Sequence, residues 1–155
     1  MDGGFMPSRR GGAAVGMLDE LPAIEAGAVV ALRLACAPMS DPARRDFSRL
    51  PGGRAAIDAL CQMADVCATF GRRPLMHHAL TCRCLGGDEA CLAQIVAAVL
   101  AGDRDDAMAL ACLMARADLA PVLVSHAERA GVALSRMAAA PAHETDHGAG
   151  AATLH

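Results

Sequence analysis

The side chains best suited to chemistry in this sequence are concentrated between His77 and Cys91. This segment holds three of the seven cysteines and two of the six histidines of the 155-residue chain. Imidazole and thiolate groups are the preferred ligands of zinc, and they are also the groups that carry redox and nucleophilic chemistry. The segment is therefore where we expect a functional site.

The spacing of these residues suggests a tetrahedral metal site. The four candidate ligands are His78, Cys82, Cys84 and Cys91, with His77 as an alternative to His78. A short helix starting at Pro74 would place His78 and Cys82 one turn apart on the same face. The Gly86–Gly87 turn would then fold the following helix back over the loop. Zinc is the cofactor that this ligand set suggests, and we expect no other, although the spacing is not that of a standard zinc finger.

Redox chemistry is a second interpretation of the same atoms. Cys82 and Cys84 flank Arg83, and Cys91 lies near an expected helix N-terminus, two settings that favour thiolate over thiol. An iron–sulfur cluster would need a fourth thiolate from another helix. The third interpretation is that the cysteines are small apolar side chains that fill space in the core. We adopt this interpretation for the cysteines on apolar helix faces, namely Cys36, Cys61, Cys67 and Cys112.

Three further features of the sequence suggest functions that we do not expect them to have. Residues 66–87 lack Asp and Glu but contain three arginines, which we interpret as a solvated basic edge. The segment His143–His147 matches the His-Glu-x-x-His pattern of zinc proteases, but no apolar helix face accompanies it, so we expect no protease. His126 follows two apolar residues, and we expect a satisfied histidine at the core boundary.

The elements that must position these residues are predicted to be helices. Alanine and leucine dominate the chain, aromatic residues make up 2%, and apolar residues recur every three or four positions. We expect an all-α fold: a compact bundle of about five to six short helices with flexible termini. The domain is predicted to span residues 17–137, between a flexible segment 1–16 and a disordered tail 138–155.

Aspartates and glycines indicate where the helices begin and end. Asp88, Asp103 and Asp118 each precede an apolar run and are predicted as N-caps. Gly102 and Gly131 are predicted to end the first and third of these runs, and Ser40 or Asp41 is predicted to cap a helix over residues 41–50. Gly71 should end the preceding long helix in a left-handed conformation.

Composition excludes several classes of function. The net charge is −3, and no aromatic platform is available for base stacking, so we expect no nucleic-acid binding. No run is long and apolar enough for a membrane span or a signal peptide, and we expect a cytoplasmic protein with reduced thiols. Fourteen arginines and no lysine indicate a GC-rich genome, and we expect a bacterial source.

The sequence therefore predicts a small cytoplasmic regulatory or adaptor protein rather than an enzyme. Residues 77–91 would be its metal- or redox-responsive element, and its partner would be another protein or a second copy of itself. The alternatives are a metal- or thiol-dependent enzyme that uses the same cluster, or a purely structural helical subunit of a complex.

Overall fold

The computed structural model describes residues 10–141, and most of these residues are helical. Within this range lie six α-helices: α1 (Ala23–Ala35), α2 (Pro42–Arg49), α3 (Gly53–Phe70), α4 (Gly87–Leu100), α5 (Arg104–Met114) and α6 (Ala120–Ala139). Short 3-10 turns lie at Arg10–Gly12, Leu18–Glu20 and Ala117–Leu119, and two short strands, β1 (Ala14–Met17) and β2 (Cys84–Gly86), form one antiparallel pair. The predicted helical bundle is confirmed.

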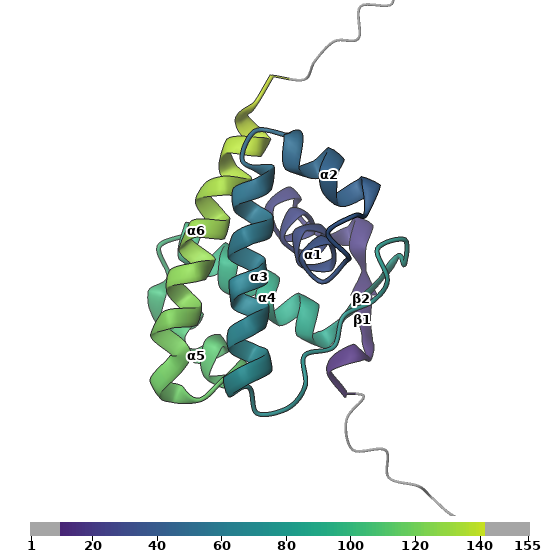
Figure 1. Ribbon diagram of the computed structural model, residues 1–155. Helices are drawn as coiled ribbons and strands as arrows, with labels where there is room; N and C mark the ends of the chain where they lie inside the picture. The colour runs from purple at the N-terminus through teal and green to yellow at the C-terminus, as the bar shows by residue number, and fades with distance from the viewer. Residues whose placement is uncertain (1–9, 142–155) are drawn as a thin grey trace, which may run out of the picture.

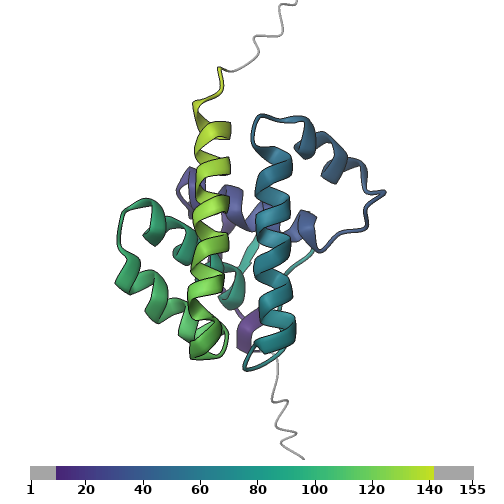
Figure 2. The same ribbon diagram turned by 60° about the vertical axis from the view of Figure 1, so that its left-hand side comes forward.

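The long helices α3 and α6 lie side by side and antiparallel along one side of the protein (Figures 1 and 2). Helix α4 packs against α1, α5 and α6, and α1 also packs against α3. The core contains many alanines with leucine, isoleucine and valine between them, and its largest buried side chains include Leu32, Leu60, Ile95 and Leu123. Alanine faces let neighbouring helix backbones approach closely, so a core with few aromatic rings can still be filled.

The predicted helix boundaries are correct where a local side chain closes the helix. The Asp41 carboxylate accepts the amide of Ala43 at 2.8 Å, and the Asp103 carboxylate accepts that of Asp106 at 3.2 Å. Gly102 adopts φ +79° directly after α4, as a C-terminal glycine should.

Other predicted boundaries are wrong. Helix α4 begins at Gly87 with Gly86 as its cap, and α6 begins at Ala120, so neither Asp88 nor Asp118 is an N-cap. Gly131 lies inside α6, where its missing side chain leaves room for Leu100. Asp88 instead binds Arg73 and the Met76 amide, and Asp118 pairs with Arg116, contacts that the helix-start pattern could not show.

The segment between α3 and α4 also differs from the prediction. Gly71 is extended, with φ −71° and ψ 155°, and pairs with Ala115 in an isolated bridge. No helix starts at Pro74; residues 74–79 have no regular secondary structure, and a turn follows. Charged side chains from α1 and α4 bind the backbone of this segment, which removes the need for helical hydrogen bonds.

The end of the predicted flexible segment is ordered. Residues 14–17 form β1, which pairs with β2 in the register Met17↔Cys84 and Ala14↔Gly86. Figure 1 shows this pair at the edge of the bundle. Among residues 10–141, no helix has both the length and the apolar character needed to cross a membrane.

Two left-handed glycines allow a matched test of the fold. A Cβ atom at Gly52 (φ +76°) would lie 2.2 Å from the Ala133 carbonyl oxygen, whereas one at Gly102 (φ +79°) would meet nothing within 4 Å. Gly102→Ala should lower the free energy of unfolding only by the penalty for a left-handed conformation, about 1–2 kcal/mol. Gly52→Ala should lower it clearly more, because the α6 backbone must also move. Urea unfolding measures both values. Equal losses would show that α3 and α6 are not packed as described.

Candidate functional site

A buried arginine organises the segment that contains the candidate ligands. Arg33, on the last turn of α1, is 2% exposed. Its Nε and Nη2 donate to the Glu89 carboxylate at 2.7 and 2.9 Å. Its Nη1 donates to the carbonyls of Ala79 and Cys82 at 3.1 and 2.5 Å, and its Nη2 donates to that of Cys84 at 2.7 Å. All five N–H groups of the guanidinium are thus matched by five acceptors.

Glu89 completes this arrangement from the first turn of α4. Its side chain is fully buried and accepts the backbone amides of Gly86 at 2.9 Å and His78 at 3.0 Å, in addition to Arg33. Burial raises the pKa of Glu89, but the hydrogen bonds from Arg33, Gly86 and His78 lower it by more, so the net pKa is below its ordinary value. The carboxylate is therefore charged at neutral pH and holds both ends of the loop.

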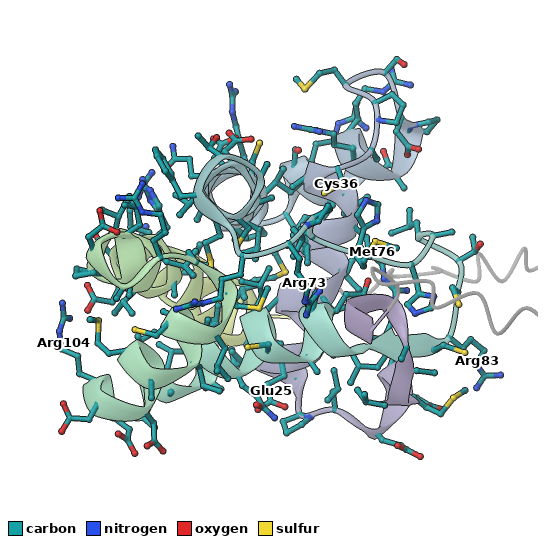
Figure 3. All side chains as sticks on the ribbon, turned by 90° about the horizontal axis from the view of Figure 1, so that it is seen from below. Glu25, Cys36, Arg73, Met76, Arg83 and Arg104 are labelled. Atoms are coloured by element: carbon teal, nitrogen blue, oxygen red, sulfur yellow. The ribbon has the colours of Figure 1, made fainter. Side chains whose placement is uncertain are left out.

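A second carboxylate fastens the start of the same segment. Asp88, which is 1% exposed, accepts Arg73 Nη1 and Nη2 at 2.8 and 2.5 Å and the Met76 amide at 2.9 Å. A Cβ atom at Gly11 would lie 2.1 Å from Asp88 Oδ2, so the N-terminal segment packs directly on this pair. Figure 3 shows Arg73 and Met76 beside the loop. We call the Arg33–Glu89 and Arg73–Asp88 pairs together the loop anchor.

Held in this way, His78 and Cys82 come together. His78 Nε2 lies 2.9 Å from the Gly12 carbonyl oxygen, and because a carbonyl can only accept, Nε2 carries the proton. The lone pair of Nδ1 then faces Cys82 Sγ at 3.8 Å. A turn closed by the Cys82 amide and the Ala79 carbonyl, 2.9 Å apart, produces this proximity. The predicted contact therefore exists, but not on the predicted helix.

Cys84 lies beside Cys82 at the start of β2. The neighbouring Cys82 side chain is the main cause of a raised pKa at Cys84, and the Arg33 guanidinium opposes it. The arrangement places one thiol beside an imidazole and a second thiol two residues further along the chain.

Cys91 does not join this group. Its side chain is half-buried on α4, and its thiol donates to the Leu110 carbonyl at 3.9 Å. Burial, with the nearby charge of Asp88, raises the pKa of Cys91 to about 11. The expectation that the helix N-terminus favours its thiolate is therefore wrong, because desolvation outweighs the helix dipole and the opposing effect of Arg73.

No metal centre is assembled within residues 10–141. No three His, Cys, Asp or Glu side chains in this range are placed so that they could hold a metal ion. His78 contacts Cys82, whereas Cys91 faces α5. The alternative ligand His77 is exposed and borders a different cavity of about 440 Å³, with Cys36 and Cys61.

The remaining cysteines divide by burial. Cys67 is a buried core residue, as predicted, and burial raises its pKa to about 12. Cys61 and Cys112 are half-buried, and Cys36 is exposed directly after α1, so the prediction of a core residue is wrong for Cys36. The described cysteines are all free thiols.

The predicted basic edge is only partly balanced by acidic groups. Arg73 pairs with Asp88, and Arg83 pairs with Asp19 at 3.2 Å. Arg72 makes no ion pair within residues 10–141 and donates to the Cys112 carbonyl at 2.9 Å. Arg83 points away from the body of the protein (Figure 3).

Sequence reasoning missed the loop anchor. The sequence predicts Asp88 only as an N-cap and assigns no role to Arg33 or Glu89. One signal was available: Arg33 lies four residues after Val29 on the apolar face of α1, where a charge must find a buried partner. The candidate motif at His143–His147 lies outside the described residues.

Comparison with known proteins gives no relative: no family model matches the chain, and no curated protein or solved structure is similar to it.

The loop anchor should dominate stability. Glu89→Gln would leave the buried Arg33 guanidinium without its counter-charge, which typically costs about 3–5 kcal/mol. Asp46→Asn is the matched control, because the Asp46–Arg49 pair is exposed and such pairs contribute about 0–1 kcal/mol. Urea unfolding measures both variants, and similar small losses would contradict the assigned role of Glu89.

His126 should make stability depend on pH. Its Nδ1 atom is buried with no hydrogen-bond partner among the described residues, which corrects the expectation of a satisfied histidine. Burial first, and Arg129 second, lower the pKa of His126 below 6.5. The unfolded chain therefore binds the proton more readily, and stability present above about pH 6.5 should decline as the pH falls through the folded pKa. In His126→Gln this decline should shrink; an unchanged slope between pH 7 and 5 would refute the assignment.

Proposed function

We propose that this protein is a redox-responsive regulatory module whose sensing thiol is Cys82 and whose resolving thiol is Cys84. The observation that supports the proposal is the contact between His78 Nδ1 and Cys82 Sγ, with the Cys84 thiol two residues further along the chain. An imidazole lone pair at this position can accept the thiol proton, and the thiolate is the reactive form of cysteine.

The oxidation proceeds in two steps. His78 takes the Cys82 proton, and the thiolate attacks one oxygen of a hydroperoxide, which breaks the O–O bond. Cys82 becomes a sulfenic acid, and the leaving oxygen departs as water or alcohol with a proton from His78. Cys84 then gives its proton to His78, the Cys84 thiolate attacks the Cys82 sulfur, and a disulfide forms as the S–O bond breaks. The sulfenic oxygen leaves as water with the proton from His78. A cellular thiol restores both groups by exchange.

Access for a small oxidant is available beside Cys82. A cavity of about 300 Å³ borders Cys82 and is lined on its apolar side by Leu18 and Leu80. Cys82 itself is half-buried. Cys67 and Cys91 have raised pKa values, so they should react more slowly.

Oxidation would change the structure through the loop anchor. Arg33 binds the carbonyls of both Cys82 and Cys84, and a disulfide between residues two apart cannot form without local rearrangement of their backbone. Strand β1 pairs with β2 at Cys84, and His78 holds the Gly12 carbonyl. The N-terminal strand is therefore the element whose docking should respond, and a protein partner or a second copy of this chain would detect the change.

A thiol-dependent enzyme is the second candidate, because the cavity beside Cys82 could hold a small substrate next to the His78–Cys82 pair. The two candidates differ in stoichiometry. A switch consumes about one oxidant per chain, whereas an enzyme with a reductant present turns over repeatedly.

Peroxide titration with peptide mapping tests the proposal. One equivalent of hydrogen peroxide should produce a Cys82–Cys84 disulfide before Cys61 or Cys112 is modified. In Cys84→Ser, Cys82 should instead stop at a sulfenic acid that dimedone traps.

Cys61→Ser is the matched control, since it removes another half-buried thiol outside this cluster. It should leave the disulfide yield unchanged. Uniform slow oxidation of all seven cysteines, or preferential linkage to Cys91, would refute the proposal. Stoichiometric zinc bound through Cys82 in freshly purified protein would favour the metal hypothesis instead.

A further inference from the structure

A second candidate site is formed by arginines between α2 and α3. Arg44, Arg45, Ser48 and Arg49 line one wall from α2, and Arg54 and Asp58 line the other from α3. They enclose a cavity of about 420 Å³. The spacings i, i+1, i+4 and i+5 on α2, and i and i+4 on α3, direct these residues to one face of each helix. We call this cavity the arginine groove.

One of the four guanidinium groups is held rigidly. Arg44 Nη1 donates to the carbonyls of Leu34, Ala35 and Ala37 at 3.1, 3.0 and 2.9 Å. These carbonyls lie at or just after the C-terminal end of α1, where intrahelical donors run out, and that of Leu34 also accepts the Ala37 amide at 3.1 Å. With Nη1 fixed in this way, the remaining edge of the guanidinium keeps its orientation in the groove, and little side-chain entropy is lost when it binds a ligand.

The other arginines leave positive charge available. Arg45 and Arg54 make no ion pair within residues 10–141, and Arg49 pairs only with Asp46 at 3.4 Å, where both side chains are more than 70% exposed. Asp58 is the single acid among the lining residues, so the groove carries four positive charges against one negative charge. This local excess contrasts with the net charge of −3 for the whole chain.

We propose that the arginine groove binds a small phosphate-bearing molecule. Planar guanidinium groups bind phosphate oxygens through two parallel hydrogen bonds, and several of them around one cavity favour a dianionic group. The volume lies within the range of small-ligand sites. Asp58 and Ser48 can accept hydrogen bonds from hydroxyl groups of the same ligand. No aromatic ring lines the groove, so the lining offers no platform for a nucleobase.

Isothermal titration with inorganic pyrophosphate and glucose 6-phosphate tests this site on the full chain, with glucose as the uncharged control. Both phosphate compounds should bind once per chain, and glucose should not bind. The double variant Arg45→Gln/Arg54→Gln should lose at least about tenfold in affinity, since two charge-assisted contacts are removed. Arg45→Lys/Arg54→Lys should lose part of the affinity, because lysine keeps the charge but lacks the bidentate geometry.

The matched control is Arg129→Gln/Arg136→Gln, which removes the same charge from exposed positions on α6. It should change the affinity less than about twofold. Failure of both phosphate compounds to bind at millimolar concentration would overturn the proposal. Equal losses in the two double variants would also overturn it, because the effect would then be one of net charge. Binding of a polyglutamate peptide but not of the phosphate compounds would assign the groove to an acidic protein segment instead.

Discussion

The buried ion pair between Arg33 and Glu89 is the interaction on which the rest of this structure depends. Taking both charges out of water costs several kcal/mol, and a buried ion pair offsets that cost only when its remaining hydrogen-bonding groups are satisfied. Here they are: three loop carbonyls accept from Arg33, and two loop amides donate to Glu89. The pair therefore supplies hydrogen bonds to the loop backbone that regular secondary structure would otherwise provide. A hydrophobic substitute of similar volume could fill the space, but it would remove five hydrogen bonds to the backbone of the loop.

The same turn of α1 connects the two candidate sites. Arg33 donates hydrogen bonds to the loop that carries Cys82 and Cys84. The carbonyls of the next residues, Leu34 and Ala35, accept from Arg44 at the arginine groove. Figure 1 shows α1 between the β1–β2 pair and α2. Helix α1 thus contacts both the loop that carries Cys82 and the helix that carries Arg44.

The sequence predicts the helical architecture because that information is local. Apolar periodicity locates the helices, and Asp41, Asp103 and Gly102 close them through contacts with residues a few positions away. What it could not predict depends on distant residues. Arg33 and Glu89 are 56 positions apart, and their pairing leaves residues 74–79 without regular secondary structure. His78 and Cys82 were correctly expected to meet, whereas Cys91 was not separated from them, since neither spacing nor composition reveals which way a half-buried thiol faces.

The most direct measurement is the rate at which iodoacetamide alkylates Cys82 as a function of pH, compared between His78→Gln and His77→Gln. Glutamine can keep the hydrogen bonds to Gly12 and to the thiol, but it cannot accept a proton at neutral pH. If the loop anchor holds His78 as the base for Cys82, His78→Gln should slow alkylation at pH 7 by at least about tenfold. His77→Gln should leave the rate unchanged, because His77 faces a different cavity. Equal rates in the wild type and His78→Gln would contradict the account.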